Sequence, residues 1–276
     1  MTGTSQATAA VIQLNGRASW AENQPIIERL VREAAQSGAQ LAVLPENLYA
    51  MPADPSALRA MGFSPDEPPL RWLQNLARTA GIWLVAGTLP IRDEASGKLW
   101  ARSYVLTATG EIAAEYDKIH LFDVTVPDGE EGESYRESDL FLAGSTPVVV
   151  DTPIGRLGLS ICFDLRFPEL FRRLVDAGAT VISLPAAFTE TTGRAHWECL
   201  LRARAIENQV VMLAAGQVGT HASGRKTWGH SLIVDPWGQV LADAADHPDC
   251  QRTATWSREA QQQLRTSFPV LSLRRL

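Results

Sequence analysis

The chain has 276 residues, of which 45% are hydrophobic and 20% are charged, and its formal net charge is −6. This composition is typical of a globular protein and excludes a disordered, collagen-like or coiled-coil chain. Lysine and arginine are scattered rather than clustered, so the sequence favours a small-molecule partner and predicts no nucleic-acid partner. The start lacks the pattern of a signal peptide, and the chain has no apolar run of about 18 residues, so no membrane span is expected.

The cysteines and the absence of linkers bear on compartment and domain organisation. Cys162, Cys199 and Cys250 are too few and too widely spaced for a disulfide framework, which favours a cytoplasmic location. No Gly/Ser-rich or Pro-rich linker divides the sequence, so we expect one domain over residues 1–276. The acidic run 128–133 is expected to be a solvated loop, and the tail 268–276 is expected to dock on a partner subunit.

Short apolar runs alternate with segments of helical periodicity, which is the pattern of an α/β fold. In the first half this predicts helices at 24–36 and 69–80, and strands at 9–14, 41–44, 82–89, 101–106 and 112–116. In the second half it predicts helices at 169–176 and 197–208, and strands at 148–150, 157–161, 181–184, 210–215, 231–234 and 239–242. Neighbouring strands that are joined by tight turns imply mixed sheets.

A cysteine stands where the apolar strand 157–161 gives way to the start of a helix. A side chain at a sharp strand-to-helix turn is presented at the carboxyl edge of the sheet, and the backbone N–H groups that follow point at whatever it attacks. Cys162 is therefore the candidate nucleophile. Its position is equally compatible with a buried, inert cysteine.

Two further charged residues follow buried strands directly. Glu46 follows strand 41–44, and Lys118 follows strand 112–116. A neutral thiol needs a neighbouring base or cation to act as a nucleophile near pH 7. Each of the two alone is compatible with a solvated surface side chain, but together with Cys162 they form a candidate catalytic set.

The sequence around these three residues resembles the carbon–nitrogen hydrolase (nitrilase) superfamily, which has a Glu-Lys-Cys triad. The matching motifs are LPEN at Glu46, YDKIHLF at Lys118, ICFDLRFPEL at Cys162, AHWECLLRARAIENQ at 195–209 and GHSLIVDPWG at 229–238. The resemblance implies an α/β fold that is a four-layer αββα sandwich with mixed sheets. It also implies protomers that assemble into a homodimer or a higher homo-oligomer.

The resemblance assigns catalytic roles to particular residues. Glu46 is the expected general base and Cys162 the nucleophile, while Lys118 and the backbone N–H of Phe163 stabilise the oxyanion. Glu137 matches an auxiliary carboxylate that orients Lys118 and the substrate amide. Phe163 stands where the family usually has tyrosine, but the expected role belongs to its backbone.

Residues that select the substrate are predicted from their position relative to the nucleophile. Arg166, four residues after Cys162, is the candidate for binding a substrate carboxylate. An alternative role for Arg166 is to brace its helix through Glu169 or Asp164. Three further residues, Tyr49, Phe188 and Thr192, are expected to line the mouth of the pocket.

The segments HLFDVTVPDG, TGRAHWE and LLRARAIENQ are similar to the amidase branch of the superfamily. This similarity implies hydrolysis of the primary amide of a small carboxylate-bearing substrate to acid and ammonia through a thioester. Deaminated glutathione is the favoured substrate, which implies a role in metabolite repair. The alternatives are 2-oxoglutaramate or 2-oxosuccinamate, and an N-carbamoyl amino acid.

Two other classes of function remain open at this stage. A papain-like hydrolase would use Cys162 with His230 and Asn208, and in it Glu46 would be dispensable. A non-enzymatic binding protein on a hydrolase fold is the other alternative. No spacing of cysteine and histidine matches a zinc site, and no dinucleotide or phosphate-binding motif is present, so neither a metal nor a cofactor is expected.

Overall fold

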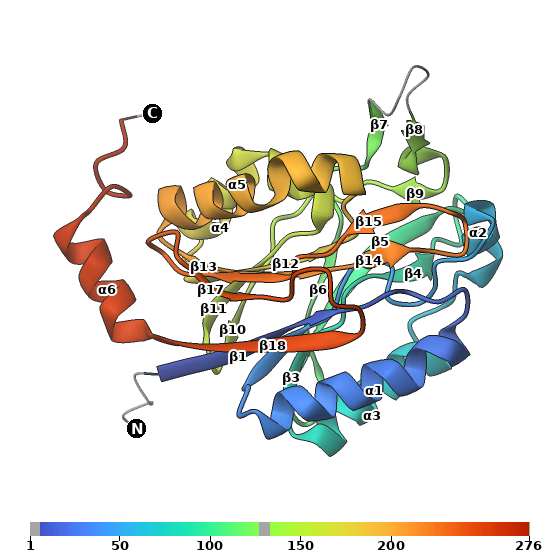
Figure 1. The fold of residues 1–276 in the computed structure, drawn as a ribbon, viewed down its shortest axis with the longest axis horizontal. Helices are drawn as coiled ribbons and strands as arrows, with labels where there is room; N and C mark the ends of the chain where they lie inside the picture. Colours follow the sequence, from blue (N-terminus) through green and yellow to red (C-terminus); the bar gives the residue numbers. More distant parts are fainter. Residues whose placement is uncertain (1–5, 127–132, 276) are drawn as a thin grey trace.

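The computed structural model describes residues 6–126 and 133–275 of the chain, without the side chains of Pro55 and Glu133. The acidic run predicted at 128–133 lies outside this range except for the backbone of Glu133. Two mixed sheets face each other, and helices cover the outer side of each sheet (Figure 1). The predicted four-layer αββα sandwich is therefore confirmed.

The first sheet has eight strands in the order β18-β1-β2-β3-β5-β4, with β6 and β9 also paired to β5. These strands are β1 (Gln6–Gln13), β2 (Leu41–Val43), β3 (Trp83–Val85), β4 (Leu89–Arg92), β5 (Leu99–Leu106), β6 (Ile112–Asp117), β9 (Phe141–Leu142) and β18 (Cys250–Ser257). The three strands β1, β2 and β3 are parallel, so the carboxyl ends of β2 and β3 meet at one edge.

The second sheet has six strands in the order β10-β11-β12-β13-β16-β17. They are β10 (Val149–Thr152), β11 (Gly155–Leu159), β12 (Val181–Ala186), β13 (Val211–Gly216), β16 (Leu232–Val234) and β17 (Val240–Asp243). Strands β11, β12 and β13 are parallel. Two short hairpins stand apart from the sheets: β7 (Asp123–Val126) with β8 (Glu133–Arg136), and β14 (Val218–Thr220) with β15 (Lys226–Trp228).

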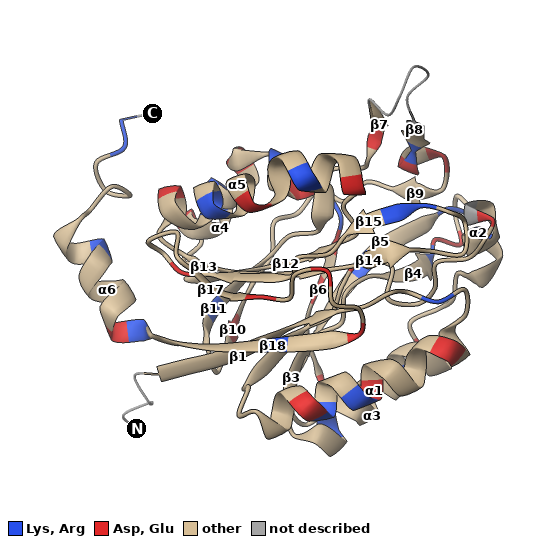
Figure 2. Ribbon diagram, viewed as in Figure 1, with Lys and Arg blue, Asp and Glu red and all other residues tan. Residues whose placement is uncertain are grey.

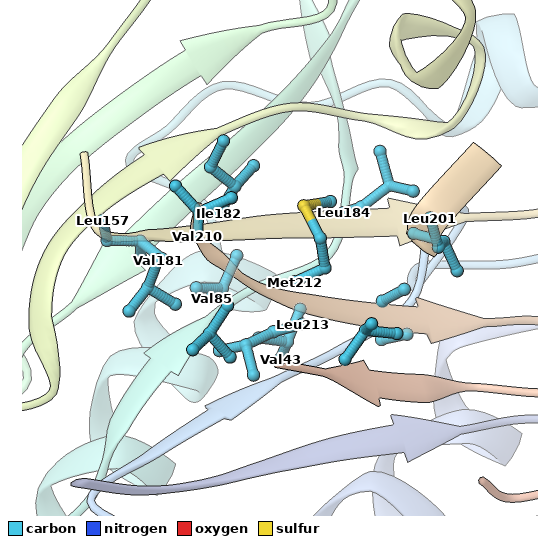
Figure 3. Close-up of a cluster of buried hydrophobic side chains, with 14 of the residues drawn as sticks. Val43, Val85, Leu157, Val181, Ile182, Leu184, Leu201, Val210, Met212 and Leu213 are labelled. Atoms are coloured by element: carbon cyan, nitrogen blue, oxygen red, sulfur yellow. The ribbon is translucent and has the colours of Figure 1, made fainter. Parts of the chain in front are cut away.

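Apolar side chains fill the space between the two sheets. Val43 and Val85 of the first sheet belong to the same buried cluster as Val181 and Leu213 of the second (Figure 3). A backbone bridge between Leu14 and Gln217 also joins the sheets. This junction places Gln217, which follows β13, beside the chain that follows β1.

The outer layers are helical. α1 (Trp20–Gln36) and α3 (Pro68–Ala80) cover the first sheet, and α4 (Pro168–Asp176) and α5 (Glu190–Asn208) cover the second (Figure 1). A short α2 (Leu58–Met61) follows a 3-10 turn, η1 (Pro55–Ala57), and α6 (Arg258–Ser267) follows β18. Basic and acidic residues are interspersed along α1 and α5 (Figure 2). No helix in the described ranges has the length and apolarity needed to cross a membrane.

Helix α5 begins seven residues earlier than predicted. Thr189 caps it by accepting a hydrogen bond from the backbone N–H of Thr192. Gly193 weakens the helical signal in the sequence, but the structure requires it, because a Cβ there would lie 2.2 Å from the Cβ of Trp228. The early start carries Thr189 and Thr192 to the edge where the parallel strands of the second sheet end.

The predicted strand 82–89 is two strands, because the chain turns at Gly87. This glycine has φ +52°, and a Cβ would lie 2.0 Å from the carbonyl oxygen of Pro45. The break leaves Thr88 free to accept a hydrogen bond from the backbone N–H of Asn47 at 2.8 Å. The position of the chain next to Glu46 therefore depends on this turn.

The C-terminal tail packs on its own chain. The ring of Phe268 contacts Trp237 at 6.0 Å between centroids, and Arg274 forms an ion pair with Asp176. Apolar side chains nevertheless remain on this surface: Trp237 is 67% exposed, Phe268 53% and Leu273 58%. Docking of the tail on a partner subunit stays a prediction.

We expect this surface to be covered in a homodimer. Replacing Trp237 and Phe268 together by serine should then shift the protein toward monomer, because the interface would lose most of its apolar area. Ile112, which is 45% exposed on β6, provides the control Ile112→Ser, which should leave the oligomeric state unchanged. Light scattering over a range of concentrations measures the mass. A monomeric parent protein at high concentration would contradict the prediction.

Candidate active site

Cys162 lies at a sharp turn between the second sheet and α4. The turn is the 3-10 segment η3 (Cys162–Arg166), and Cys162 itself has φ +47°, a strained conformation for a residue with a side chain. Burial raises the pKa of the Cys162 thiol well above its ordinary value, and the charge of Glu46 raises it further. Lys118 and the backbone N–H of Ala187 act in the opposite direction.

A buried carboxylate holds this turn in place. Asp164 accepts hydrogen bonds from the backbone N–H of Ile161 at 2.8 Å and from the hydroxyl of Tyr116 at 2.7 Å. It also accepts one from the backbone N–H of His120 at 3.1 Å, and the ring nitrogen Nδ1 of His120 lies 2.6 Å away. Tyr116 and His120 flank Lys118 in sequence, so Asp164 ties the cysteine turn to the lysine segment.

Replacing Asp164 by asparagine should destabilise the protein. The substitution removes the charge and turns one acceptor oxygen into an amide that faces donors, so several N–H and O–H groups lose their partner. We expect a loss of about 2 to 4 kcal/mol in the free energy of unfolding, measured by urea denaturation. Asp151→Asn on β10 is the control, because the Asp151 side chain is 83% exposed. Equal stability of the two variants would contradict the role of Asp164.

Glu46 follows β2 and is buried, with 4% of its surface exposed. The side-chain amide of Gln217 donates to the carbonyl oxygen of Glu46 at 2.8 Å, and its amide oxygen accepts from the backbone N–H of Gly16 at 2.9 Å. The alternative that Glu46 is a solvated surface side chain is therefore excluded.

Lys118 follows β6 and is 1% exposed. Its Nζ lies 2.7 Å from Oε1 of Glu46, and 2.9 and 2.8 Å from the two carboxylate oxygens of Glu137. Burial on its own lowers the pKa of Lys118, but the charges of Glu137 and Glu46 outweigh burial, so the pKa lies above that of an ordinary lysine. Lys118 therefore stays cationic between two carboxylates.

Glu137 lies in the 3-10 segment η2 (Glu137–Asp139), and it is held from two sides. Besides Lys118, the backbone N–H of Phe122 donates to its Oε2 at 2.6 Å. Burial raises the pKa of Glu137, and Lys118 partly offsets this. The structure thus brings Glu46, Lys118, Glu137 and Cys162 together, although they are far apart in sequence.

These four residues line a cavity of about 790 Å³. Phe163, Arg166, Phe188 and Thr192, which were predicted to bind substrate, also line this cavity. Its other lining residues include Arg59, Tyr135, Arg136, Ala187, Thr189 and Arg225. This volume is within the usual range for small-molecule sites. In the described part of the chain, no three His, Cys, Asp or Glu side chains are arranged to hold a metal ion.

Arg166 lies between two aromatic rings. Its guanidinium carbon is 5.8 Å from the centroid of Phe163 and 5.3 Å from that of Phe188. Its Nη1 is 3.2 Å from Nδ1 of His196. Among the ion pairs of the described residues, none joins Arg166 to Glu169 or Asp164, the two partners proposed for a bracing role.

Tyr49 lies elsewhere than predicted. Its ring stacks on Trp20 at 5.5 Å and contacts Phe63 at 5.2 Å, and it is not among the residues that line the cavity. The reason is that the chain turns away after Glu46 and packs Tyr49 between the first sheet and its helices. Of the residues predicted to bind substrate, Tyr49 is therefore the one that the structure does not bring to the cavity.

His230 and Asn208, the partners in the papain-like alternative, do not line the cavity either. Nδ1 of His230 lies 3.2 Å from a carboxylate oxygen of Asp243, and its ring stacks on Trp228. Asn208 is fully buried at the end of α5, where its amide donates to the carbonyl oxygen of Arg204 at 3.0 Å. This geometry favours a carboxylate over a histidine as the base for Cys162.

Comparison with known proteins agrees with this arrangement. The carbon-nitrogen hydrolase family model matches residues 8–265. Deaminated glutathione amidase of Yersinia enterocolitica is 43% identical over 242 residues, which are 87% of this chain and 83% of that protein.

Solved structures are similar as well. The NitFhit protein of C. elegans superposes with a TM-score of 0.91 at 37% identity, over 98% of this chain and 65% of that longer chain. A double mutant of the amidase from Nesterenkonia sp. AN1, in complex with acrylamide, superposes with a TM-score of 0.81 at 25% identity, over 100% of this chain and 96% of that one. The chain therefore belongs to the carbon–nitrogen hydrolase (nitrilase) superfamily and is an amidase of that family.

Proposed function

We propose that Cys162 attacks the carbonyl carbon of the substrate amide while Glu46 takes the thiol proton. The tetrahedral oxyanion that forms is stabilised by Lys118 and the backbone N–H of Phe163. Glu46 returns the proton to the leaving amine, the C–N bond breaks, and a thioester remains on Cys162. A water that loses its proton to Glu46 then attacks the thioester, which releases the acid and restores the thiol.

One observation carries this assignment: a buried lysine shared by the buried Glu46 and the partly buried Glu137 lines the same cavity as the cysteine. A buried cluster of this kind costs desolvation energy and stays only where each charge is paired. With Glu137 holding Lys118 at 2.8 Å, Glu46 is free to change its protonation without leaving the lysine unpaired. Glu137 is therefore a positioning residue for Lys118 in this proposal.

We propose deaminated glutathione as the substrate. The support is the name of the relatives at about 40% identity, together with a cavity of about 790 Å³, which has room for a tripeptide-sized molecule. In this assignment Arg166, held between Phe163 and Phe188, binds the carboxylate of the acyl part. Phe188 and Thr192 also line the cavity.

The expectation that ammonia is released is wrong for deaminated glutathione, because of the amides that this molecule contains. Deaminated glutathione carries two peptide-type secondary amides and no primary amide. Hydrolysis of the amide next to its acyl part therefore yields a 2-oxo dicarboxylic acid and the amine of cysteinylglycine. Ammonia would be the product only for a primary amide such as 2-oxoglutaramate.

The products therefore distinguish the two substrates. Wild-type protein and Cys162→Ala are incubated separately with deaminated glutathione and with 2-oxoglutaramate, and the acid, cysteinylglycine and ammonia are quantified by mass spectrometry and an ammonia assay. We expect a higher kcat/KM for deaminated glutathione and no product from Cys162→Ala. A higher kcat/KM for 2-oxoglutaramate would replace the substrate and keep the mechanism, and no turnover of either would refute both substrates.

A cytoplasmic location is part of the proposal. The three cysteines are free thiols in the structure, as a reducing compartment would keep them. Cys162 must be reduced to act as a nucleophile, because an oxidised sulfur cannot attack an amide carbonyl.

A further inference from the structure

Arg225 reaches the cavity from the loop between β14 and β15. Its Nη2 donates to the carbonyl oxygen of Ala187 at 2.6 Å, and its guanidinium lies 5.4 Å from the ring centroid of Tyr135 on β8. Its Nε is buried and has no hydrogen-bond partner among the described residues. The guanidinium of Arg225 therefore keeps hydrogen-bonding capacity that the protein does not use, and a ligand acceptor in the cavity would be bound favourably.

A second arginine lines the same cavity. Arg136 follows Tyr135 on β8, is exposed, and faces the cavity. Its register partner on β7 is Asp123, whose pKa is lowered by hydrogen bonds from Ser138 and also by the charge of Arg136. Neither Arg136 nor Arg225 belongs to an ion pair within 4.0 Å in the described part of the chain, whereas Lys118 is neutralised by Glu46 and Glu137.

The distance of Arg225 from Cys162 determines which part of a bound substrate Arg225 can contact. The backbone N–H of Ala187 faces the Cys162 thiol, and the carbonyl of the same residue holds Arg225. Arg225 is thus one residue and one hydrogen bond from the neighbourhood of the sulfur. Two extended residues span about 7 Å, which is the reach from a scissile nitrogen to the far carboxylate of a dipeptide leaving group.

We propose that Arg225, together with Arg136, binds a carboxylate at the far end of the leaving group. This inference rests on the proposed function, in which Arg166 takes the carboxylate of the acyl part. The guanidinium of Arg225 offers its charge and its N–H groups to one carboxylate, and Arg136 adds charge at the exposed side. The enzyme would thereby prefer amides whose leaving group is a short peptide with a free C-terminus.

The test compares two substrates that differ only at this carboxylate: deaminated glutathione and its C-terminal amide. For the wild type we expect kcat/KM to be about 10-fold or more higher for the free acid, mainly through KM. In Arg225→Gln and in Arg136→Gln this acid-over-amide ratio should fall severalfold toward one. The control Arg32→Gln, a surface residue on α1 paired with Glu28, should keep the wild-type ratio.

The ratio is the decisive quantity, because loss of the hydrogen bond to Ala187 also changes overall activity in Arg225→Gln. Arg136 is exposed, so Arg136→Gln decides the question if the Arg225 variant fails to fold. A wild-type ratio near one, or a ratio unchanged in the folded variants, would overturn the inference while the proposed substrate stands.

Failure of the proposed function is recognised separately. If the wild type does not hydrolyse deaminated glutathione, binding of the acid and of its amide to Cys162→Ala is measured by calorimetry. Tighter binding of the acid that is lost in Cys162→Ala/Arg225→Gln would support the carboxylate site without the reaction. Equal binding of the two compounds would refute the site as well.

Discussion

Glu46→Gln is expected to lower kcat/KM by about 10³-fold or more and to leave the protein folded. Glutamine keeps the shape of the side chain and an oxygen for the Lys118 ammonium, which lies 2.7 Å from Oε1. Lys118 then remains paired with Glu137, so the buried pair is neutral and the fold has no new unpaired charge. The amide cannot accept a proton from Cys162 or from water, and a general base contributes typically about 10² to 10⁴-fold to each such step.

The matched comparison is His230→Ala. The papain-like alternative predicts that this variant is inactive and that Glu46→Gln is active, and the carboxylate mechanism predicts the reverse. His230 lies beside Trp228 and Asp243 and does not line the cavity of Cys162, so its loss should lower kcat/KM by less than about 10-fold. Circular dichroism and thermal melting show whether each variant is folded. An active Glu46→Gln would remove Glu46 from the mechanism.

The catalytic set was predictable because each member stands within three residues of the end of a strand. Glu46 and Lys118 follow β2 and β6 of the first sheet, and Cys162 follows β11 of the second. Each charge alone was compatible with a solvated surface side chain, and only the three residues together indicated a catalytic set. The resemblance to a family then added the roles, which spacing alone left open.

Other parts of the site gave no signal of this kind. In the sequence, Asp164 is indistinguishable from an acidic residue in a surface turn. Only the structure shows its buried contacts with Tyr116 and His120. The hairpin that carries Arg225 is short and polar, so neither strand β14 nor strand β15 shows an apolar alternation. The environment of the Arg225 guanidinium arises from packing against segments about 40 to 90 residues away in sequence. Hydrophobic periodicity indicates local structure and does not predict such contacts.

Strand β18 and helix α6 were not predicted, because neither has a clear hydrophobic pattern. β18 is the edge strand of the first sheet and pairs with β1 on one side alone, so its sequence is mostly polar. The hydrophobic pattern identifies strands that bury both faces and overlooks one that does not. α6 buries a single residue, Gln261, and therefore has little apolar face to recognise.

Lys118→Met is expected to remove activity and also to destabilise the fold. Methionine fills the space of the aliphatic stem, but the carboxylates of Glu46 and Glu137 would then face each other without a cation. Breaking a buried ion pair by removing one partner typically costs about 3 to 5 kcal/mol. Loss of one oxyanion donor lowers the rate by about 100-fold or more. Both the free energy of unfolding in urea and kcat/KM are measured.

The stability lost in Lys118→Met should depend on pH and on a second substitution. Burial raises the pKa of Glu137 and Lys118 opposes this, so without Lys118 the carboxyl of Glu137 binds a proton more readily in the folded than in the unfolded state. The variant therefore regains stability as the pH falls. The difference in unfolding free energy between wild type and Lys118→Met should therefore be smaller at pH 5.5 than at pH 8. Lys118→Met/Glu137→Gln, with one carboxylate removed, should recover stability at pH 8 but no activity. Recovery of activity would mean that Lys118 only balances charge and does not stabilise the oxyanion.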